Sequence, residues 1–118
     1  METYDKYDIQ SFSDDLGLST KDIADLYDEL IQEINNELHQ LKHSIHDNDL
    51  QSAREIMHNL KGISGNYRIT DIHEQTVKIQ AVLKNMTTDN LEPLFENYFT
   101  ICHNAIIDIK LYFEQAGR

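Results

Sequence analysis

The chain has 118 residues, of which 40% are apolar, and this length predicts a single domain that spans residues 1–118. Its formal net charge of -11 argues against DNA, RNA and anionic membranes as partners, because the 10 lysines and arginines are scattered and form no basic cluster. The single cysteine excludes an internal disulfide, and the chain shows neither a signal-peptide pattern nor an apolar run near the ~18 residues that span a bilayer, so we expect a cytoplasmic protein.

The first long segment is expected to be one amphipathic helix of about 27 residues, because its apolar residues recur at intervals of three or four. These residues are Ile23, Leu26, Leu30, Ile34, Leu38, Leu41 and Ile45. Ser19 followed by Asp22 resembles a capping box at the start of this helix. The preceding residues 1–18 are expected to form a short helix or an arm that closes one end of the helical domain.

Two further helices are expected in the middle of the chain. Asp49 or Asn48 can cap the first of them. Its buried stripe consists of Ala53, Ile56, Met57, Leu60, Ile63, Ser64 and Tyr67. After a short connection at residues 68–71, Thr70 is expected to cap the next helix. That helix buries Ile72, Thr76, Ile79, Leu83 and Met86.

A turn at residues 87–90 is expected to lead into a fourth long helix, with Pro93 in its first turn, where a missing N–H is tolerated. The buried face of this helix consists of Leu94, Phe95, Tyr98, Phe99, Cys102, Ala105, Ile106, Ile109 and Phe113. No segment alternates with period two, so strands are not expected. The sequence therefore predicts an all-α fold, an antiparallel four-helix bundle over residues 19–115.

One surface of the second long helix carries an unusual set of residues. At about 100° per residue, His58 points about 160° away from the buried stripe, toward solvent. The same outward face carries Gln51, Arg54, Lys61 and Gly65, with Gly62 beside it, and all of these except Lys61 are expected to contact a partner. Because they lie on an outward face, the two glycines are not expected to make room for a neighbouring helix. Each costs about 1 kcal/mol relative to alanine, which indicates that something must approach the backbone closely. The alternative is a solvated surface histidine, but the flanking cations make a small positive site suited to a dianionic group.

Gln80 is expected to lie near His58. The connection between the second and third helices centres near residue 69, and both side chains lie 11 positions from that centre. In an antiparallel hairpin they therefore lie at the same height. The Gln80 amide can accept a hydrogen bond from Nδ1–H of His58 and leave the Nε2 lone pair facing outward, as a nucleophilic imidazole requires.

The stretch "HNLKGIS", with apolar residues and then Gln80 further along, resembles the signature of histidine-containing phosphotransfer (HPt) domains. That signature reads His-x-Leu-Lys-Gly, followed by small residues and later by a Glu or Gln. Residues 12–31 resemble the family's entry into its first long helix, and "DNDLQSAREIMHNLKG" resembles the acidic turn before its active-site helix. The chain departs from the pattern at Ile63, where a small residue is common, and at Arg68, where glycine is common and where the turn is expected to differ.

The resemblance implies a phosphorelay intermediate in which His58 accepts a phosphoryl group from a receiver-domain aspartate and passes it to another receiver. Lys61 would neutralise the phosphoryl oxygens, Gly62 would leave space for the receiver, and Gln80 would orient the ring. The Mg²⁺ that such transfers need would be held by the receiver, and no cofactor is expected on this chain. The sequence has no nucleotide-binding motif, so autokinase activity is not expected. We expect a monomer, because His58 must stay accessible.

Two other functions remain open at this point. One is a degenerate bundle that binds a receiver or a kinase without accepting phosphate. The other is a metal-binding bundle, because His39, His43 and His46 have ligand spacing, although all three fall on a polar face and are expected to be solvated. His73 and His103 are expected to be isolated structural or surface residues. The domain-sized chain suggests a stand-alone protein, although a domain of a larger hybrid kinase would look the same.

Overall fold

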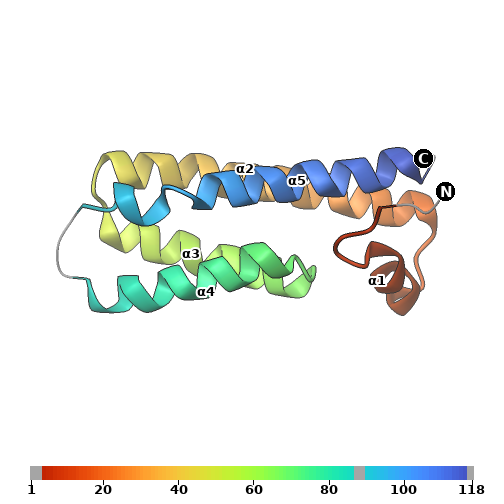
Figure 1. Ribbon diagram of the computed structural model, residues 1–118, viewed down its shortest axis with the longest axis horizontal. Coiled ribbons are helices and arrows are strands. Elements are labelled where there is room, and N and C mark those ends of the chain that lie inside the picture. The colour runs from red at the N-terminus through yellow and green to blue at the C-terminus, as the bar shows by residue number, and fades with distance from the viewer. Residues whose placement is uncertain (1–3, 87–89, 117–118) are drawn as a thin grey trace.

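The computed structural model describes residues 4–86 and 90–116, and within them it contains helices and no strand. The elements are α1 (Ile9–Leu16), α2 (Thr20–His46), α3 (Leu50–Asn66), α4 (Thr70–Asn85), the short 3-10 helix η1 (Glu92–Phe95) and α5 (Tyr98–Gln115). The four long helices run antiparallel to their chain neighbours, and α1 folds against one end of the bundle (Figure 1). The predicted all-α bundle is confirmed. No helix in the described ranges is long and apolar enough to cross a membrane.

Two of the three predicted N-terminal caps are confirmed. The Ser19 hydroxyl accepts a hydrogen bond from the Asp22 N–H at 3.1 Å, and the Asp49 carboxylate accepts one from the Ser52 N–H at 3.1 Å. The predicted Thr70 cap is wrong, because Thr70 is already the first residue of α4. The residue before it, Ile69, is completely buried, so packing rather than a polar side chain fixes the start of this helix.

The predicted position of Pro93 is also wrong. Pro93 lies in η1, which is separate from α5, and α5 begins only at Tyr98. The 3-10 helix buries Leu91 and Phe95 against the bundle, and this packing replaces the first turn of a continuous helix. Of the turn predicted at residues 87–90, residues 87–89 lie outside the described residues.

The predicted apolar stripes form one core between the four long helices. The first stripe is wider than expected, because Tyr27 and Ile31 are also buried, whereas Leu26 is half-buried. Thr76 and Tyr98 join α4 to α5 inside this core through a 2.6 Å hydrogen bond between their hydroxyl groups. Cys102 is completely buried, and burial raises the pKa of its thiol to about 12. The thiol therefore stays protonated and packs as a small apolar side chain.

Arg68 ends α3 in a turn that glycine would normally form. Its φ of 58° lies in the left-handed region. The next N–H, that of Ile69, donates to the carbonyl oxygen of Ser64 at 2.9 Å, which completes a Schellman turn. Arg68 therefore has the left-handed backbone that glycine adopts most readily. Two side-chain contacts offset the strain of this left-handed conformation. The guanidinium lies over the Phe12 ring, 4.8 Å from the centroid, and pairs with Asp15 at 2.9 Å.

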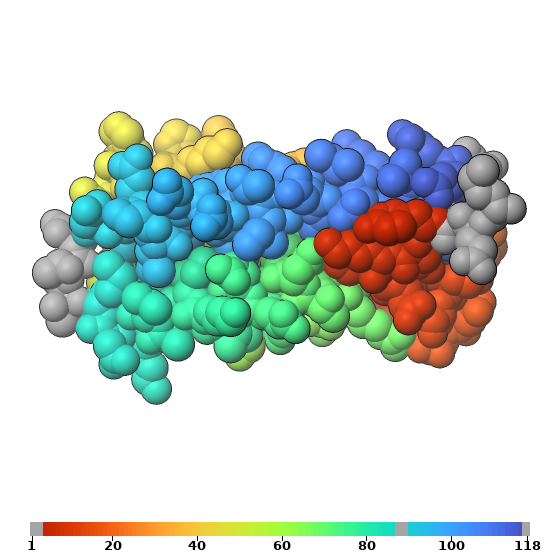
Figure 2. Space-filling model, in the orientation of Figure 1, coloured from red at the N-terminus to blue at the C-terminus, as the bar shows by residue number. Residues whose placement is uncertain are grey.

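These contacts attach α1 to the turn after α3, where Figure 2 shows α1 packed against the end of the bundle. Arg68→Ala is expected to lower the free energy of unfolding by about 1 kcal/mol, because it keeps the strained backbone and loses the ring contact and the exposed ion pair. Arg68→Gly loses the same contacts but relieves about 1 kcal/mol of strain, so its stability is expected to stay near that of the wild type. Urea denaturation measures both values. An Arg68→Gly variant that is no more stable than Arg68→Ala would contradict this account.

Candidate functional site

His58 lies in the middle of α3 with its side chain exposed to solvent. Met57 and Leu60, one residue before and two residues after His58, are both buried in the core. Their burial fixes the rotation of α3 about its axis and turns His58 toward solvent. Across the described part of the chain, the His58 ring makes no hydrogen bond and no ion pair. Both ring nitrogens are therefore open to a group that approaches from outside.

Lys61 and Gly62 follow His58 by one helical turn, and both are exposed. The Lys61 ammonium forms no ion pair with any residue that the structure describes. A Cβ atom added to Gly62 would meet no other atom within 4 Å. No packing inside the protein therefore requires a glycine at this position. The proposed docking clearance at Gly62 stays a prediction.

The second glycine of this face, Gly65, has a different role from the one expected. A Cβ atom on Gly65 would lie 3.2 Å from both Cε1 and Nδ1 of His73 on α4. The same Nδ1 lies 3.3 Å from the carbonyl oxygen of Lys61. The expectation that Gly65 makes no room for a neighbouring helix is therefore wrong, and the contact of Gly65 with a partner stays a prediction. The contacts of His73 agree with the structural residue that was expected there. Gly65 lets the His73 ring pack closely against α3.

Arg54 is also placed differently from the expectation of a free cation beside His58. It is half-buried, and its Nε and Nη2 donate to the carbonyl oxygen of Leu83 at 3.1 and 2.7 Å. Nη2 also donates to the carbonyl oxygen of Met86 at 3.2 Å. These carbonyls belong to the C-terminal end of α4, where helical oxygens lack backbone partners and attract cations. Arg54 therefore ties α3 to the end of α4, and its contact with a partner stays a prediction.

Gln80 lies on α4, half-buried, at the edge that faces α3. It shares a notch of about 270 Å³ with Arg54, Leu83 and Lys84. In the described structure the Gln80 amide makes no hydrogen bond with the His58 ring. Its proposed role in orienting the ring is therefore not seen in the unbound chain and stays a prediction.

The two sides of the His58 face carry opposite charge. On the α2 side, Asn59 donates to Glu37 at 3.1 Å, and burial together with nearby Glu33 raises the pKa of Glu37. The other side, toward α4, carries Lys61, whose carbonyl oxygen contacts His73, and Lys84, which lines the notch with Arg54. Lys84 was not among the residues expected at this site, although it follows Gln80 by one helical turn.

Gln51 is exposed in the first turn of α3, about two helical turns before His58, and its amide donates to Glu55 at 3.2 Å. Its contact with a partner stays a prediction.

The histidines of α2 are exposed and arranged along the helix surface. The rings of His39 and His43 meet edge to face, with centroids 4.9 Å apart, and His46 pairs with Asp47 at 3.1 Å. Within residues 4–86 and 90–116, no group of three or more His, Cys, Asp or Glu side chains has the arrangement of a metal site. The structure therefore gives no support to the metal-binding alternative.

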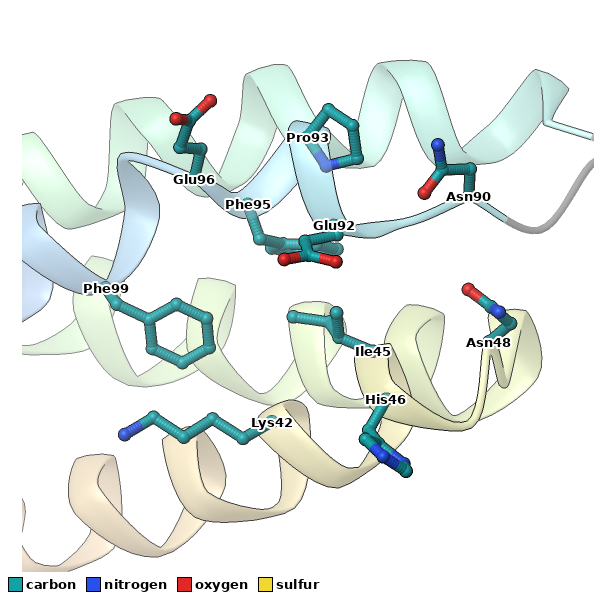
Figure 3. A pocket seen from close by; sticks show the side chains of 10 residues that line it. All are labelled: Lys42, Ile45, His46, Asn48, Asn90, Glu92, Pro93, Phe95, Glu96 and Phe99. Carbon is teal, nitrogen blue, oxygen red and sulfur yellow. The ribbon is translucent and has the colours of Figure 1, made fainter.

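A hollow with a volume of about 800 Å³ lies where the end of α2 meets η1 (Figure 3). Lys42 lies on one wall of it, with its ammonium 5.4 Å from the centroid of the Phe99 ring. Glu92 and Glu96 lie on the η1 side. This hollow does not include His58 or Lys61, so it is separate from the site on α3.

Comparison with known protein families gives one match. The family model described as Hpt domain matches residues 25–116, which include all of α3 and α4. No curated protein and no solved structure matches the chain. The match covers well over half of the sequence and includes the exposed His58 and the basic residues beside it. The chain therefore belongs to the Hpt domain family, which serves in histidine phosphotransfer in phosphorelays.

Proposed function

We propose that this protein is a phosphorelay intermediate that carries a phosphoryl group on His58. It accepts the group from the aspartyl phosphate of one receiver domain and passes it to another receiver domain. The observation that carries this proposal is an imidazole exposed in the middle of α3, with the Lys61 ammonium and open space at Gly62 one turn away. Membership of the Hpt domain family supports the same chemistry.

The transfer step follows from the chemistry of the imidazole. The Nε2 lone pair attacks phosphorus, the new N–P bond forms, and the P–O bond to the aspartate breaks. The aspartate leaves as a carboxylate, and Nδ1 keeps its proton. Such transfers pass through a loose transition state, so positioning and charge neutralisation supply most of the rate. Lys61 neutralises the phosphoryl oxygens, because no acid in the described structure competes for its ammonium.

Gln80 is proposed to accept a hydrogen bond from Nδ1–H of His58 once a receiver has docked. Hydrogen bonds that act in catalysis are often absent or long before the partner binds. Gln80 lies on α4, at the edge that faces α3, and lines the notch with Arg54. The Mg²⁺ of the reaction belongs to the acidic pocket of the receiver, and this chain supplies no cofactor and no autokinase activity. We further propose that the protein acts in the cytoplasm as a monomer.

A second function has one observation in its favour. Because Gln80 and His58 are not hydrogen bonded, the chain can also be read as a degenerate bundle that binds a receiver or a kinase without accepting phosphate. The two functions differ in whether a covalent N–P bond ever forms.

Labelling by phosphorylated receivers separates the two functions. The full chain is incubated with each receiver domain of its own genome, phosphorylated with radioactive phosphate. We expect at least one receiver to label the chain, and we expect the label to be stable in alkali, labile in acid and transferable to a second receiver. A chain that binds a receiver and is never labelled would support the degenerate bundle. A label that survives acid would exclude phosphohistidine.

A further inference from the structure

One edge of α4 carries a row of four residues toward the His58 face. His73, Val77, Gln80 and Lys84 follow one another at intervals of three or four and therefore share one stripe of the helix. Both ends of the row reach α3. At one end the His73 ring packs on Gly65, and at the other end Gln80 and Lys84 line the notch with Arg54. The residues between the two ends must face the same edge.

Val77 is the apolar member of this α4 row, and 41% of its surface is exposed. The contacts at either end of the row place it along the helix. His73 lies next to Lys61 and Gly65, and Leu83 lies next to Arg54. In an antiparallel pair these contacts put Val77 level with the turn from His58 to Lys61. An exposed valine thus lies next to the His58 face and has no role in the core.

The two sides of α3 carry side chains of opposite charge, basic toward the α4 row and acidic toward α2. The α4 side presents the ammonium groups of Lys61 and Lys84, and neither forms an ion pair in the described part of the chain. The α2 side presents Glu33 and Glu37, whose mutual repulsion helps to raise the pKa of Glu37. A partner with an acidic surface is therefore attracted to one side of α3 and repelled by the other.

We propose that the partner's receiver domain docks over α3 and the α4 row, away from the acidic surface of α2. The occupant is a receiver whose acidic phosphoaspartate pocket meets Lys61 and Lys84. A neighbouring apolar side chain of that receiver covers Val77. This inference rests on the proposed function for its partner, and it adds the direction of docking and two contact residues, Val77 and Lys84.

The same helix provides matched controls. Val82 is 48% exposed and Lys78 is also exposed, but both lie on the opposite side of α4, away from the row. Val77→Asp and Val82→Asp therefore make the same chemical change on two sides of one helix. Lys84→Glu and Lys78→Glu form a second pair. All four positions are exposed, so circular dichroism and thermal melting are expected to match those of the wild type.

Two measurements on the full chain test the proposal. Calorimetric titration with an unphosphorylated receiver gives the affinity, and label transfer from the phosphorylated receiver gives KM and kcat. Val77→Asp and Lys84→Glu are each expected to weaken binding and raise KM by about tenfold, because they disturb docking and leave His58 in place. The expected kcat, and all values for Val82→Asp and Lys78→Glu, stay within about twofold of the wild type.

The outcomes separate this proposal from the proposed function. Loss of affinity in the row variants supports the docking direction even if the chain is never labelled. Equal effects on both sides of α4 overturn it, even if His58 is phosphorylated. A larger effect of Glu33→Lys than of Lys84→Glu also overturns it, because that result places the receiver over α2. A wild-type chain that binds none of its receivers overturns the docking surface as well.

Discussion

Replacement of His58 by glutamine is expected to abolish labelling by a phosphorylated receiver and to leave the helical bundle intact. The glutamine amide can form hydrogen bonds but has no nucleophilic lone pair on nitrogen, so no N–P bond can form. The His58 side chain is exposed and makes no hydrogen bond or ion pair with the described residues that the substitution would remove. Label on the denaturing gel is therefore expected to fall to background while the melting temperature stays unchanged.

His103→Gln is the matched control for this variant. His103 is exposed on α5, and we assign it no role, so labelling of this variant is expected to equal that of the wild type. The affinity of His58→Gln for the unphosphorylated receiver is expected to stay within about threefold of the wild type, since docking uses the surrounding surface. Label that persists in His58→Gln would move the phosphoryl group to another residue.

Gly62→Gln is expected to stabilise the protein and to impair its function. Glutamine has a higher helix propensity than glycine, and a Cβ at this position meets no other atom, so the free energy of unfolding is expected to rise by about 0.5 kcal/mol. The new side chain fills the space beside His58 that a receiver must enter. Since displacement of a reacting group by about 1 Å can lower a rate about 100-fold, we expect a loss of label transfer of at least that size.

Gly65→Ala provides the contrast, because its Cβ would lie 3.2 Å from the His73 ring. This variant is expected to gain less stability than Gly62→Ala, since the ring must shift before the methyl group fits. Urea denaturation of both alanine variants measures the difference. Gly62→Gln with wild-type transfer rates would show that the open space at Gly62 is not used for docking.

The helices and the core of this protein are largely predictable from the sequence. Apolar residues at intervals of three or four locate the long helices, and polar residues such as Ser19 and Asp49 mark where α2 and α3 begin. The exposure of His58 follows from the same periodicity, because the position of a residue around a helix depends only on its spacing from the buried stripe. These features depend on the order of residues within one helix, and they can therefore be predicted without knowledge of how the helices pack.

Features that depend on contacts between helices were not predictable. Arg54 lies on the outward part of α3, but the carbonyl groups that bind it belong to the end of α4. From the sequence, Gly65 and Gly62 fall on neighbouring parts of the same outward face of α3. Only the packing of α4 on α3 brings His73 against Gly65. The start of α4 likewise depends on the burial of Ile69 rather than on a capping side chain.

Mapping of the phosphorylated residue tests the central claim most directly. The chain is labelled by a phosphorylated receiver, digested at alkaline pH to preserve N–P bonds, and sequenced by tandem mass spectrometry. We expect one phosphoryl group per chain, on the imidazole of His58. A phosphoryl group on any other of the 6 histidines, or on a carboxylate, would contradict the account.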